Sequence, residues 1–267
     1  MVSPLQGHLV KINFKGFALA ILVGVGINVI NPVKSLATPS FQLTPMEMQF
    51  TPSGGGVNRS FLVQSAGDKP IAVQITIVKR QMAVDGAEVR TDAEEDFIIY
   101  PPQIILQPNQ TQSVRVTWLG ESSPTKELAY RIIAEQVPIE SIESQPTESK
   151  TERVANIKVL FKYEGTIYIT PSNASPQIIL QTAESLVEKD RTQLVLNFEN
   201  QGTAHQLLNS LKVTLTSNDG KTVTLQGEQL KGVIGENILA GNKRRFVLPW
   251  PKELPVGPVT ATFETSP

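Results

Sequence analysis

The longest regular pattern of apolar and polar positions lies near the middle of the chain, over residues 153–171, RVANIKVLFKYEGTIYITP. Its apolar residues fall on alternate positions, namely Ile157, Val159, Phe161, Tyr163, Ile167 and Ile169. Polar residues lie between them at Lys158, Lys162, Glu164 and Thr166. Because successive side chains of a strand point to opposite faces, this pattern predicts one long strand with an apolar face. A strand longer than the usual ~5 to 6 residues is expected to project past its own core and to need a partner.

The chain from Phe41 onward shows short apolar runs separated by clusters of Gly, Pro, Asn and Asp, which predicts an all-β protein. The strands predicted in the first half are residues 41–50, 58–64, 71–81, 97–99, 104–106, 112–119, 128–138 and 155–170. Eight strands within about 130 residues indicate an immunoglobulin-like β-sandwich.

Two polar segments divide the rest of the chain. Residues 140–152, ESIESQPTESKTE, are rich in Ser, Glu and Thr, which predicts a mobile loop. Residues 171–176, PSNASP, are turn formers that predict a domain boundary. Strand-like runs resume at 177–181, 193–198 and 211–216, and Asn218-Asp219-Gly220 predicts a tight hairpin turn. The expected organisation is a first domain over 38–170 and a second β-sandwich over 171–267.

The beginning of the chain has a pattern of a different kind. Two lysines precede an apolar run at residues 16–30, and a small-x-small sequence, SLA, follows at residues 35–37. This order is typical of a secretory signal peptide, residues 1–37, with cleavage before Thr38. A membrane anchor is the alternative, but a membrane span needs about 20 apolar residues and this run is shorter.

Charge and cysteine content bound the partners of the mature chain. Removal of residues 1–37 leaves 230 of 267 residues and takes away Lys11, Lys15 and Lys34, which moves the net charge from -1 to -4. A mildly acidic chain is not expected to bind nucleic acid. The sequence has no cysteine, so each core must hold by burial alone, and 230 residues are enough for two cores. We expect a soluble protein of the bacterial periplasm, without stable membrane insertion after cleavage.

Several segments, in their order along the chain, resemble one known family. Residues 100–116, YPPQIILQPNQTQSVRV, join a double proline to an apolar strand, a Pro-Asn turn and an alternating strand. Residues 126–138, KELAYRIIAEQVP, precede the polar loop and the long alternating strand. These features resemble the periplasmic chaperones of chaperone-usher pilus assembly. In the second half, residues 200–213 (NQGTAHQLLNSLKV) and 241–251 (GNKRRFVLPWP) resemble the archaic branch of that family.

This resemblance implies two immunoglobulin-like domains in a boomerang arrangement and a function in holding other proteins. The last strand of the first domain is expected to complete the unfinished sandwich of a pilus or coat-protein subunit, a known form of β-augmentation, before delivery to an outer-membrane usher. The donated side chains are then Ile157, Val159, Phe161 and Tyr163. Burial of three or four such side chains, at roughly 1.5–3 kcal/mol each, suffices for tight binding. The alternative is that this face packs only against the chain's own core.

One departure from the family concerns the carboxyl terminus of the bound subunit. The family grips it with an Arg near the first strand and a Lys on the last strand, where this chain has Glu47 and Thr166. A glutamate about 4 Å from a carboxylate would cost roughly 4 kcal/mol at an effective dielectric of 20, so the anchor must differ. Arg131 and Lys162 are the candidate replacements, and the alternative is that both are ordinary solvated charges.

A second pair of charged residues has a structural role by the same resemblance. Arg115 lies in the 100–116 segment and Glu127 in the 126–138 segment. The resemblance implies that they form an internal ion pair that orients strands or domains.

The sequence gives little indication of catalysis. His205 is the only histidine left once His8 departs with the signal peptide, so it cannot build a histidine-based metal site or a relay to a cysteine. The chain has no nucleophile elbow, phosphate loop or dinucleotide fingerprint. We therefore expect no enzyme activity, no metal and no cofactor. The competing hypothesis is a structural or adhesive surface protein built from the same sandwiches, whose long strand pairs with a copy of itself.

Overall fold

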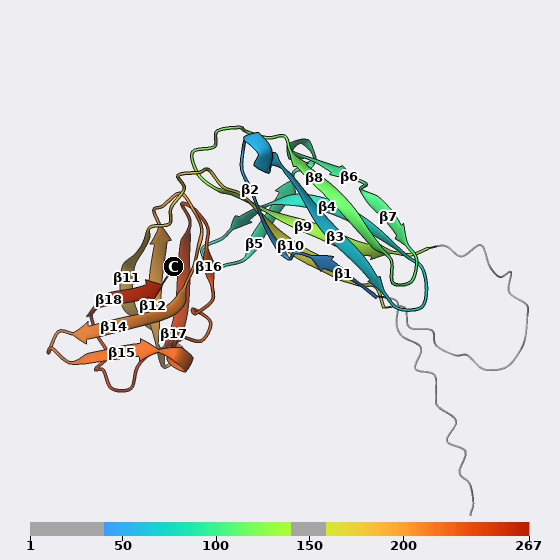
Figure 1. The fold of residues 1–267 in the computed structure, drawn as a ribbon. Coiled ribbons are helices and arrows are strands. Elements are labelled where there is room, and N and C mark those ends of the chain that lie inside the picture. The colour runs from blue at the N-terminus through green and yellow to red at the C-terminus, as the bar shows by residue number, and fades with distance from the viewer. Residues whose placement is uncertain (1–39, 140–158, 267) are drawn as a thin grey trace, which may run out of the picture. The chain divides into compact units, whose positions relative to one another are not determined.

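The structure is a computed structural model, and it describes residues 40–139 and 159–266. The expected signal peptide, the predicted loop at 140–152 and the candidate donor residue Ile157 lie outside the described residues. Within them, every regular element is a β-strand or one of the short 3-10 helices η1 (Gly54–Val57), η2 (Glu94–Asp96) and η3 (Gly227–Leu230). The expected all-β class is therefore confirmed (Figure 1).

The first half of the described chain folds into two sheets that face each other. Its strands are β1 (Ser40–Thr44), β2 (Glu47–Phe50), β3 (Asn58–Ala66), β4 (Ile71–Met82), β5 (Glu88–Asp92), β6 (Phe97–Tyr100), β7 (Gln103–Leu106), β8 (Thr111–Trp118), β9 (Leu128–Val137) and β10 (Lys162–Ile169). One sheet has the order β1-β3-β8-β6. The other has the order β2-β10-β9-β4-β5, and β7 also pairs with β4.

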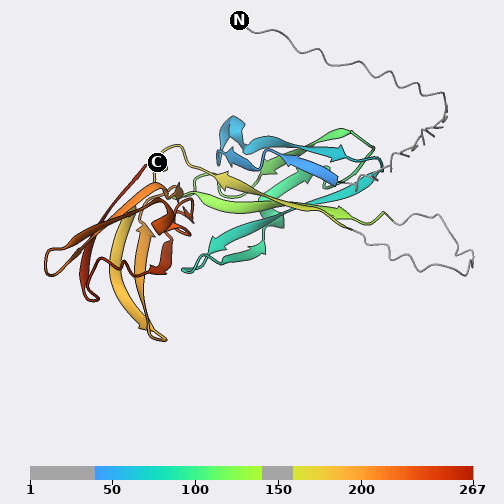
Figure 2. The same ribbon diagram turned by 90° about the horizontal axis from the view of Figure 1, so that it is seen from below.

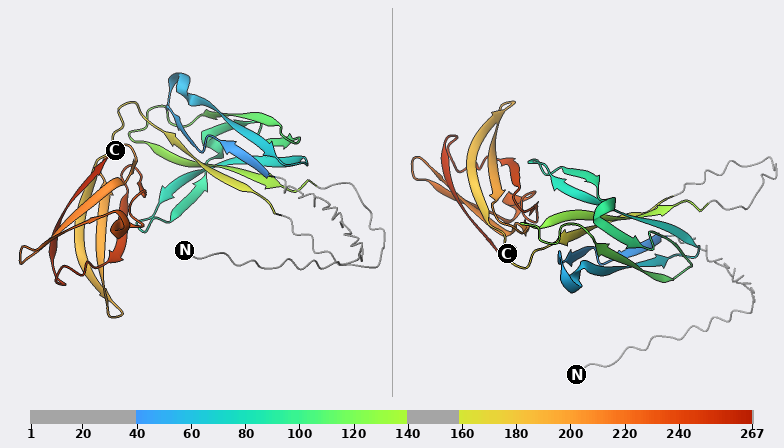
Figure 3. Two further views of the ribbon diagram at one scale, coloured as in Figure 1. Left: turned by 60° about the horizontal axis from the view of Figure 1, so that its bottom comes forward. Right: turned by 90° about the horizontal axis from the view of Figure 1, so that it is seen from above.

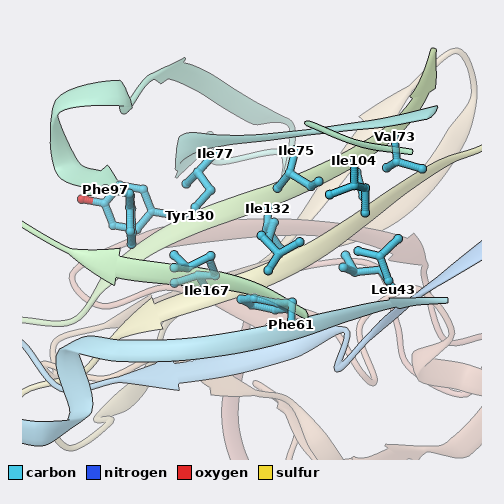
Figure 4. Packing of buried hydrophobic residues seen from close by; sticks show 14 of the residues in the cluster. Leu43, Phe61, Val73, Ile75, Ile77, Phe97, Ile104, Tyr130, Ile132 and Ile167 are labelled. Carbon is cyan, nitrogen blue, oxygen red and sulfur yellow. The ribbon is translucent and has the colours of Figure 1, made fainter. Parts of the chain in front are cut away.

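A hydrophobic core fills the space between these two sheets. Figure 4 shows Phe61 of β3 close to Ile132 of β9 and Ile167 of β10, and all three side chains are 0% exposed. Burial of such a side chain contributes roughly 1.5–3 kcal/mol. Because the chain has no cysteine, this apolar packing holds the sandwich without a covalent cross-link.

The strand expected over residues 41–50 is in fact two strands that belong to different sheets. Strand β1 pairs with β3, whereas β2 pairs in parallel with β10. Pro45 lies between them and has no N–H group to donate to a ladder, which ends the first pairing. The same segment thus supplies one edge to each sheet. The peptide bonds before Pro45 and Pro101 are cis.

The strand expected over residues 155–170 is regular over a shorter range, Lys162–Ile169. Residues 155–158 lie outside the described residues, and Val159 to Phe161 are described without regular strand geometry. Conversely, β5 was not expected, because its sequence EVRTD has no apolar alternation. It forms as the returning strand of a hairpin whose turn contains Gly86 with a φ of 94°.

The second half of the described chain forms a second sandwich with its own core, as expected. Its strands are β11 (Ile178–Glu188), β12 (Arg191–Asn200), β13 (Gln206–Leu207), β14 (Asn209–Ser217), β15 (Thr222–Gln226), β16 (Asn237–Ile238), β17 (Lys243–Pro249) and β18 (Val259–Ser266). The sheets have the orders β11-β12-β17, β15-β14-β18 and β13-β16. The hairpin predicted at residues 218–220 joins β14 to β15, and Gly220 has a φ of 81°. The exact domain boundaries stay a prediction.

Candidate functional site: the open edge of β10

The apolar face of β10 and of the residues before it passes from the core to the surface. From the core outward it is formed by Ile169, Ile167, Tyr163, Phe161 and Val159. The two isoleucines are 0% exposed, Tyr163 and Phe161 are partly buried against the core, and Val159 is 50% exposed. Val159 is therefore not enclosed by the chain's own sheets. Burial does not alternate along β10, because Thr166 and Tyr168 of the opposite face are buried too, and donation of the apolar side chains stays a prediction.

The backbone of β10 is paired on both sides in its second half but on only one side in its first half. Figures 2 and 3 show β10 beside β9, and the antiparallel register runs from Lys162 opposite Glu135 to Ile169 opposite Leu128. On the other side β2 pairs only with residues 166–169 of β10. Among the described residues, no strand pairs with this outer edge over residues 162–165.

The hydrogen bonds indicate which backbone groups of β10 face the open edge. The N–H groups of Thr166 and Thr170 donate to carbonyl groups of the β2 segment, at 2.8 and 2.9 Å. The carbonyl of Phe161 instead accepts from the N–H of Gln136, at the end of β9, at 2.8 Å. Because backbone groups of alternate residues point to the same side, Lys162 and Glu164 direct their N–H and C=O groups toward the open edge. These groups are available to an added strand.

Tyr163 lies at the point where the core ends. Its ring packs edge-on against Phe41 of β1, with ring centroids 4.9 Å apart and planes at 65°. Phe41 itself is 0% exposed. The two sheets are therefore closed around Tyr163 and become open toward Val159, where apolar side chains could enter a gap in another protein.

The open edge ends abruptly at Thr166, which lies between Glu47 of β2 and Arg131 of β9. Arg131 Nη1 donates a hydrogen bond of 2.5 Å to Thr166 Oγ1. At Gly165 an added Cβ would lie 3.0 Å from the carbonyl oxygen of Met46, so glycine permits the start of β2 to approach β10 closely. An added strand that follows β10 must end here, because β2 occupies the edge beyond.

A cluster of charged side chains adjoins this closed end on the outer face of the sheet. Arg131 bonds Glu88 through Nε, at 3.2 Å, and also through Nη2. Arg80 Nε lies 2.7 Å from Glu88 Oε1 as an ion pair, although without the angle of a hydrogen bond. Arg90 Nη2 lies 3.0 Å from Glu88 and 2.6 Å from Glu164. Three arginines thus surround the one carboxylate of Glu88.

Protonation equilibria reflect this concentration of positive charge. Burial alone would raise the pKa of Glu88, but hydrogen bonds from Arg131 and Arg90 outweigh it and lower that pKa to about 2. Burial and the nearby charge of Arg131 lower the pKa of Arg80. Glu88 is therefore a carboxylate at neutral pH, held by cations that also repel one another.

The structure separates the two candidate anchor cations. Lys162 lies opposite Glu135, and Thr166 lies opposite Arg131. Lys162 and Thr166 are four residues apart, so their positions on β10 are separated by about 13 Å. The Nζ of Lys162 is 3.3 Å from Glu164, and its side chain is 44% exposed. Only Arg131 lies at the closed end of the edge, so the two side chains do not converge on one point.

Comparison with protein families identifies the domain that contains this edge. Residues 50–174 match the family described as "Pili and flagellar-assembly chaperone, PapD N-terminal domain". The matched range contains β10, β9 and most of the first sandwich. These residues therefore belong to the N-terminal domain family of the pilus-assembly chaperones.

Solved structures agree on the fold of this pilus chaperone. The class 5 fimbriae chaperone CfaA is 15% identical, with 85% of this chain and 100% of that chain covered and a TM-score of 0.51. A chain from a chaperone–tip adhesin complex of CFA/I fimbriae is 15% identical, with 84% and 98% covered and a TM-score of 0.50. No curated protein matches this chain significantly. These likenesses show a shared fold.

The ion pair expected between Arg115 and Glu127 of the pilus chaperone is wrong. Arg115 is exposed on β8, opposite Ser60 and Tyr100, and forms no ion pair within the described residues. The side chain of Glu127 is 2% exposed and lies 2.5 Å from His205 Nδ1. Glu127 immediately precedes β9, which belongs to a different sheet from β8, so position in the sequence alone could not identify its partner.

Sequence reasoning missed the residues that complete the cluster around Arg131. Glu88 and Arg90 lie in the unexpected strand β5, and Arg80 lies near the end of β4. The sequence gives no clear signal for this cluster, because Arg80 stands between Lys79 and Gln81 in a strand that also contains Gln74 and Thr76. Among residues 40–139 and 159–266, no group of three metal-ligating side chains occurs, and no helix is long and apolar enough to cross a membrane.

Proposed function

We propose that this pilus chaperone holds pilus or coat-protein subunits by adding the open edge of β10 to their incomplete sandwiches. It then delivers them to an outer-membrane usher. The quoted segments of the second half support membership of the archaic branch. The observation that carries the proposal is the coincidence of an unpaired strand edge with apolar side chains that emerge from the core.

The energetics of the edge are sufficient for tight but reversible holding. Each backbone hydrogen bond made by Lys162 or Glu164 to an added strand contributes a net ~0.5–1.5 kcal/mol. Each apolar side chain that becomes fully buried, such as that of Val159, contributes up to roughly 1.5–3 kcal/mol. Ile157 continues the same alternation in the sequence, and we propose it as a further donated side chain. Binding of this kind needs no nucleotide and no cofactor.

The closed end of the edge determines the direction of the added strand. An added strand in line with β2 ends at Thr166, next to Arg131. Arg131 and Arg90 favour a negatively charged terminus there and oppose the charge of Glu47, so the carboxyl end of the subunit lies at Arg131 and the added strand runs parallel to β10. Lys162, further along the edge, contacts the body of the added strand rather than its terminus.

The organisation of the whole chain follows from this role. We propose a signal peptide at residues 1–37, a subunit-binding domain at 38–170 and a second domain at 171–267, located in the periplasm. The mature protein has no stable membrane insertion and no enzyme activity, because holding and release of a subunit require only strand pairing.

Two neighbouring residues of equal exposure test the proposal. Val159 and Leu160 are each 50% exposed, and the alternating sequence pattern assigns only Val159 to the apolar row. Val159→Asp places a charge on the apolar face and should reduce recovery of a co-expressed pilus or coat-protein subunit at least tenfold. Leu160→Asp should leave recovery within about twofold of the unchanged protein, because its side chain is outside the donated row. The measurement is the amount of soluble complex after affinity purification.

The comparison of these two variants shows whether subunit binding depends on the apolar row or on surface hydrophobicity in general. Equal recovery with Val159→Asp and the unchanged protein would show that the apolar row is not the binding element. Equal loss with both variants would indicate a loss of general surface hydrophobicity. Both variants should have melting temperatures close to that of the unchanged protein, because neither side chain is in the core.

A further inference from the structure

Glu88 is the common centre of a cluster whose positive members outnumber its negative ones. Arg80, Arg90 and Arg131 all contact its carboxylate, and among the described residues Glu164 is a second acid of the cluster, where it contacts Arg90 and Lys162. The side chain of Glu88 is 19% exposed and that of Arg80 is 7% exposed. Two carboxylates therefore face three guanidinium groups near the end of the open edge, and Glu88 contacts all three of them.

Each of the three side-chain nitrogens of Arg131 donates a hydrogen bond within the described chain. Its Nε and Nη2 both bond Glu88, which is the paired geometry that a guanidinium group offers to a carboxylate. Its Nη1 bonds Thr166 Oγ1. A second carboxylate could be gripped by the same pair of nitrogens only if Glu88 moved away from them.

Glu88 can leave Arg131 without becoming an unpaired buried charge. It would keep Arg80, at 2.7 Å, and Arg90, at 3.0 Å. Breaking a buried pair is costly when it leaves one charge without a partner, and here neither side is left without one. Arg131 would receive the incoming carboxylate, and Glu88 would remain held by two arginines. Because Glu88 contacts three arginines, an exchange of carboxylates at Arg131 leaves no charge without a partner.

We infer that Glu88 is an internal substitute for the subunit's carboxyl terminus, which occupies Arg131 in the free chaperone and competes with the terminus for it. This inference rests on the proposed function of Arg131 as the anchor. Competition by Glu88 weakens holding and speeds release, since a departing terminus is replaced at once by a group of the same charge. Glu88 is therefore a residue that sets the lifetime of the complex.

Acetate, used as a minimal carboxylate, tests the competition without a subunit. The Nε–H signal of Arg131 is followed by NMR during titration with sodium acetate at constant ionic strength. In Glu88→Gln the paired nitrogens lose their charged partner, so acetate should bind at least tenfold more tightly than in the unchanged protein, or about 1.4 kcal/mol. Acetamide, the neutral analogue of acetate, should bind Glu88→Gln no more tightly than it binds the unchanged protein.

Glu164→Gln is the matched control, because Glu164 also pairs with Arg90 but does not contact Arg131. It should change acetate affinity by less than about threefold. The double variant Glu88→Gln with Arg131→Gln should lose the gain in acetate affinity. Because Arg131 is absent from it, binding is measured from the NMR signals of the remaining arginines. If Glu88→Gln fails to fold, Glu88→Asp keeps the charge but shortens the reach to Arg131, and should give a gain in the same direction.

The outcomes separate this inference from the proposed function. No gain in acetate affinity for Glu88→Gln, or an equal gain for Glu164→Gln, would overturn the role of Glu88 whether or not a subunit binds. With a captured subunit, Glu88→Gln should lengthen the half-life of the complex at least tenfold, and an unchanged half-life would also overturn it. Failure of the unchanged chaperone to capture a subunit would instead contradict the proposed function and would leave the acetate result standing.

Discussion

At the scale of single residues, Glu127 illustrates how a buried charge is satisfied. Its carboxylate accepts hydrogen bonds from the Thr170 hydroxyl at 2.8 Å and from the His205 backbone N–H at 3.0 Å, and it contacts the His205 ring. The ring of His205 also stacks on Tyr168, with centroids 3.8 Å apart. Removal of a buried acceptor leaves its donors unsatisfied, which costs about 1–3 kcal/mol.

Glu127 and Arg115 give a matched prediction that tests the corrected pairing. Glu127→Ala should lower the free energy of unfolding by about 1–3 kcal/mol, because three donors lose their acceptor. Arg115→Ala should change it by less than about 0.5 kcal/mol, since Arg115 is exposed and unpaired in the described chain. Urea unfolding of both variants measures the difference. Similar losses for the two would mean that they form the originally expected pair.

The residue-scale chemistry of the site could be predicted only in part from the sequence. Arg131 was a candidate because a guanidinium group suits a carboxylate, and the structure places it beside Thr166. Its partner Glu88 could not be identified, because the contact depends on how the β4–β5 hairpin folds back over the sheet. Long side chains that reach across several strands leave no periodic signal in a sequence.

At the scale of elements, the decisive property of β10 is the difference between its two edges. One edge is paired with β9 throughout, and the other is covered by β2 only from Thr166 onward. Unpaired edges are usually protected, since they invite other chains to pair with them. Here the edge carries Lys162, whose charge discourages indiscriminate pairing, beside an apolar row that rewards a specific partner.

Proline substitutions at neighbouring positions distinguish the two edges. Lys162→Pro removes an N–H that faces the open edge, so the free protein should melt within a few degrees of Lys162→Ala while subunit capture falls at least tenfold. Tyr163→Pro removes an N–H that faces β9 and should cost ~3 kcal/mol or more of stability. Thermal melts and co-purification check the two effects. A Lys162→Pro variant that captures the subunit normally would contradict the assigned edge.

The elements themselves could be predicted well where alternation was strong. The strands corresponding to β3, β4 and β9 were expected within one or two residues of their ends. The division of residues 41–50 was missed because both halves are apolar and alternate alike, although Pro45 is a signal that such a ladder must break. Strand β5 was missed because it is mostly exposed and forms through its hairpin rather than through burial.

At the scale of the whole molecule, two separate hydrophobic cores replace disulfides in a chain that is expected to be exported. One core is that of the first sandwich and the other is that of the second. Their existence could be predicted from chain length and from the spacing of strands. How a subunit would complete the edge of β10 could not be predicted, because the proposed added strand belongs to another protein.

Export gives a prediction for the mature chain. When the gene is expressed with its own N-terminus in a Gram-negative host, protein recovered from the periplasm should begin at Thr38, because residues 35–37 form the cleavage pattern. Intact-mass spectrometry should find 230 residues. Recovery of the uncleaved chain from the membrane fraction would favour the anchor that the sequence left as the alternative.

Amide hydrogen exchange in β10 tests the central claim most directly. In the free protein, the amides of Lys162 and Glu164 should exchange rapidly, while those of Tyr163 and Gly165, which face β9, should be slow. In the complex with a subunit, the amides of Lys162 and Glu164 should become protected as a strand is added to the open edge. If these two amides still exchange rapidly in a saturated complex, the subunit is held elsewhere and the account is contradicted.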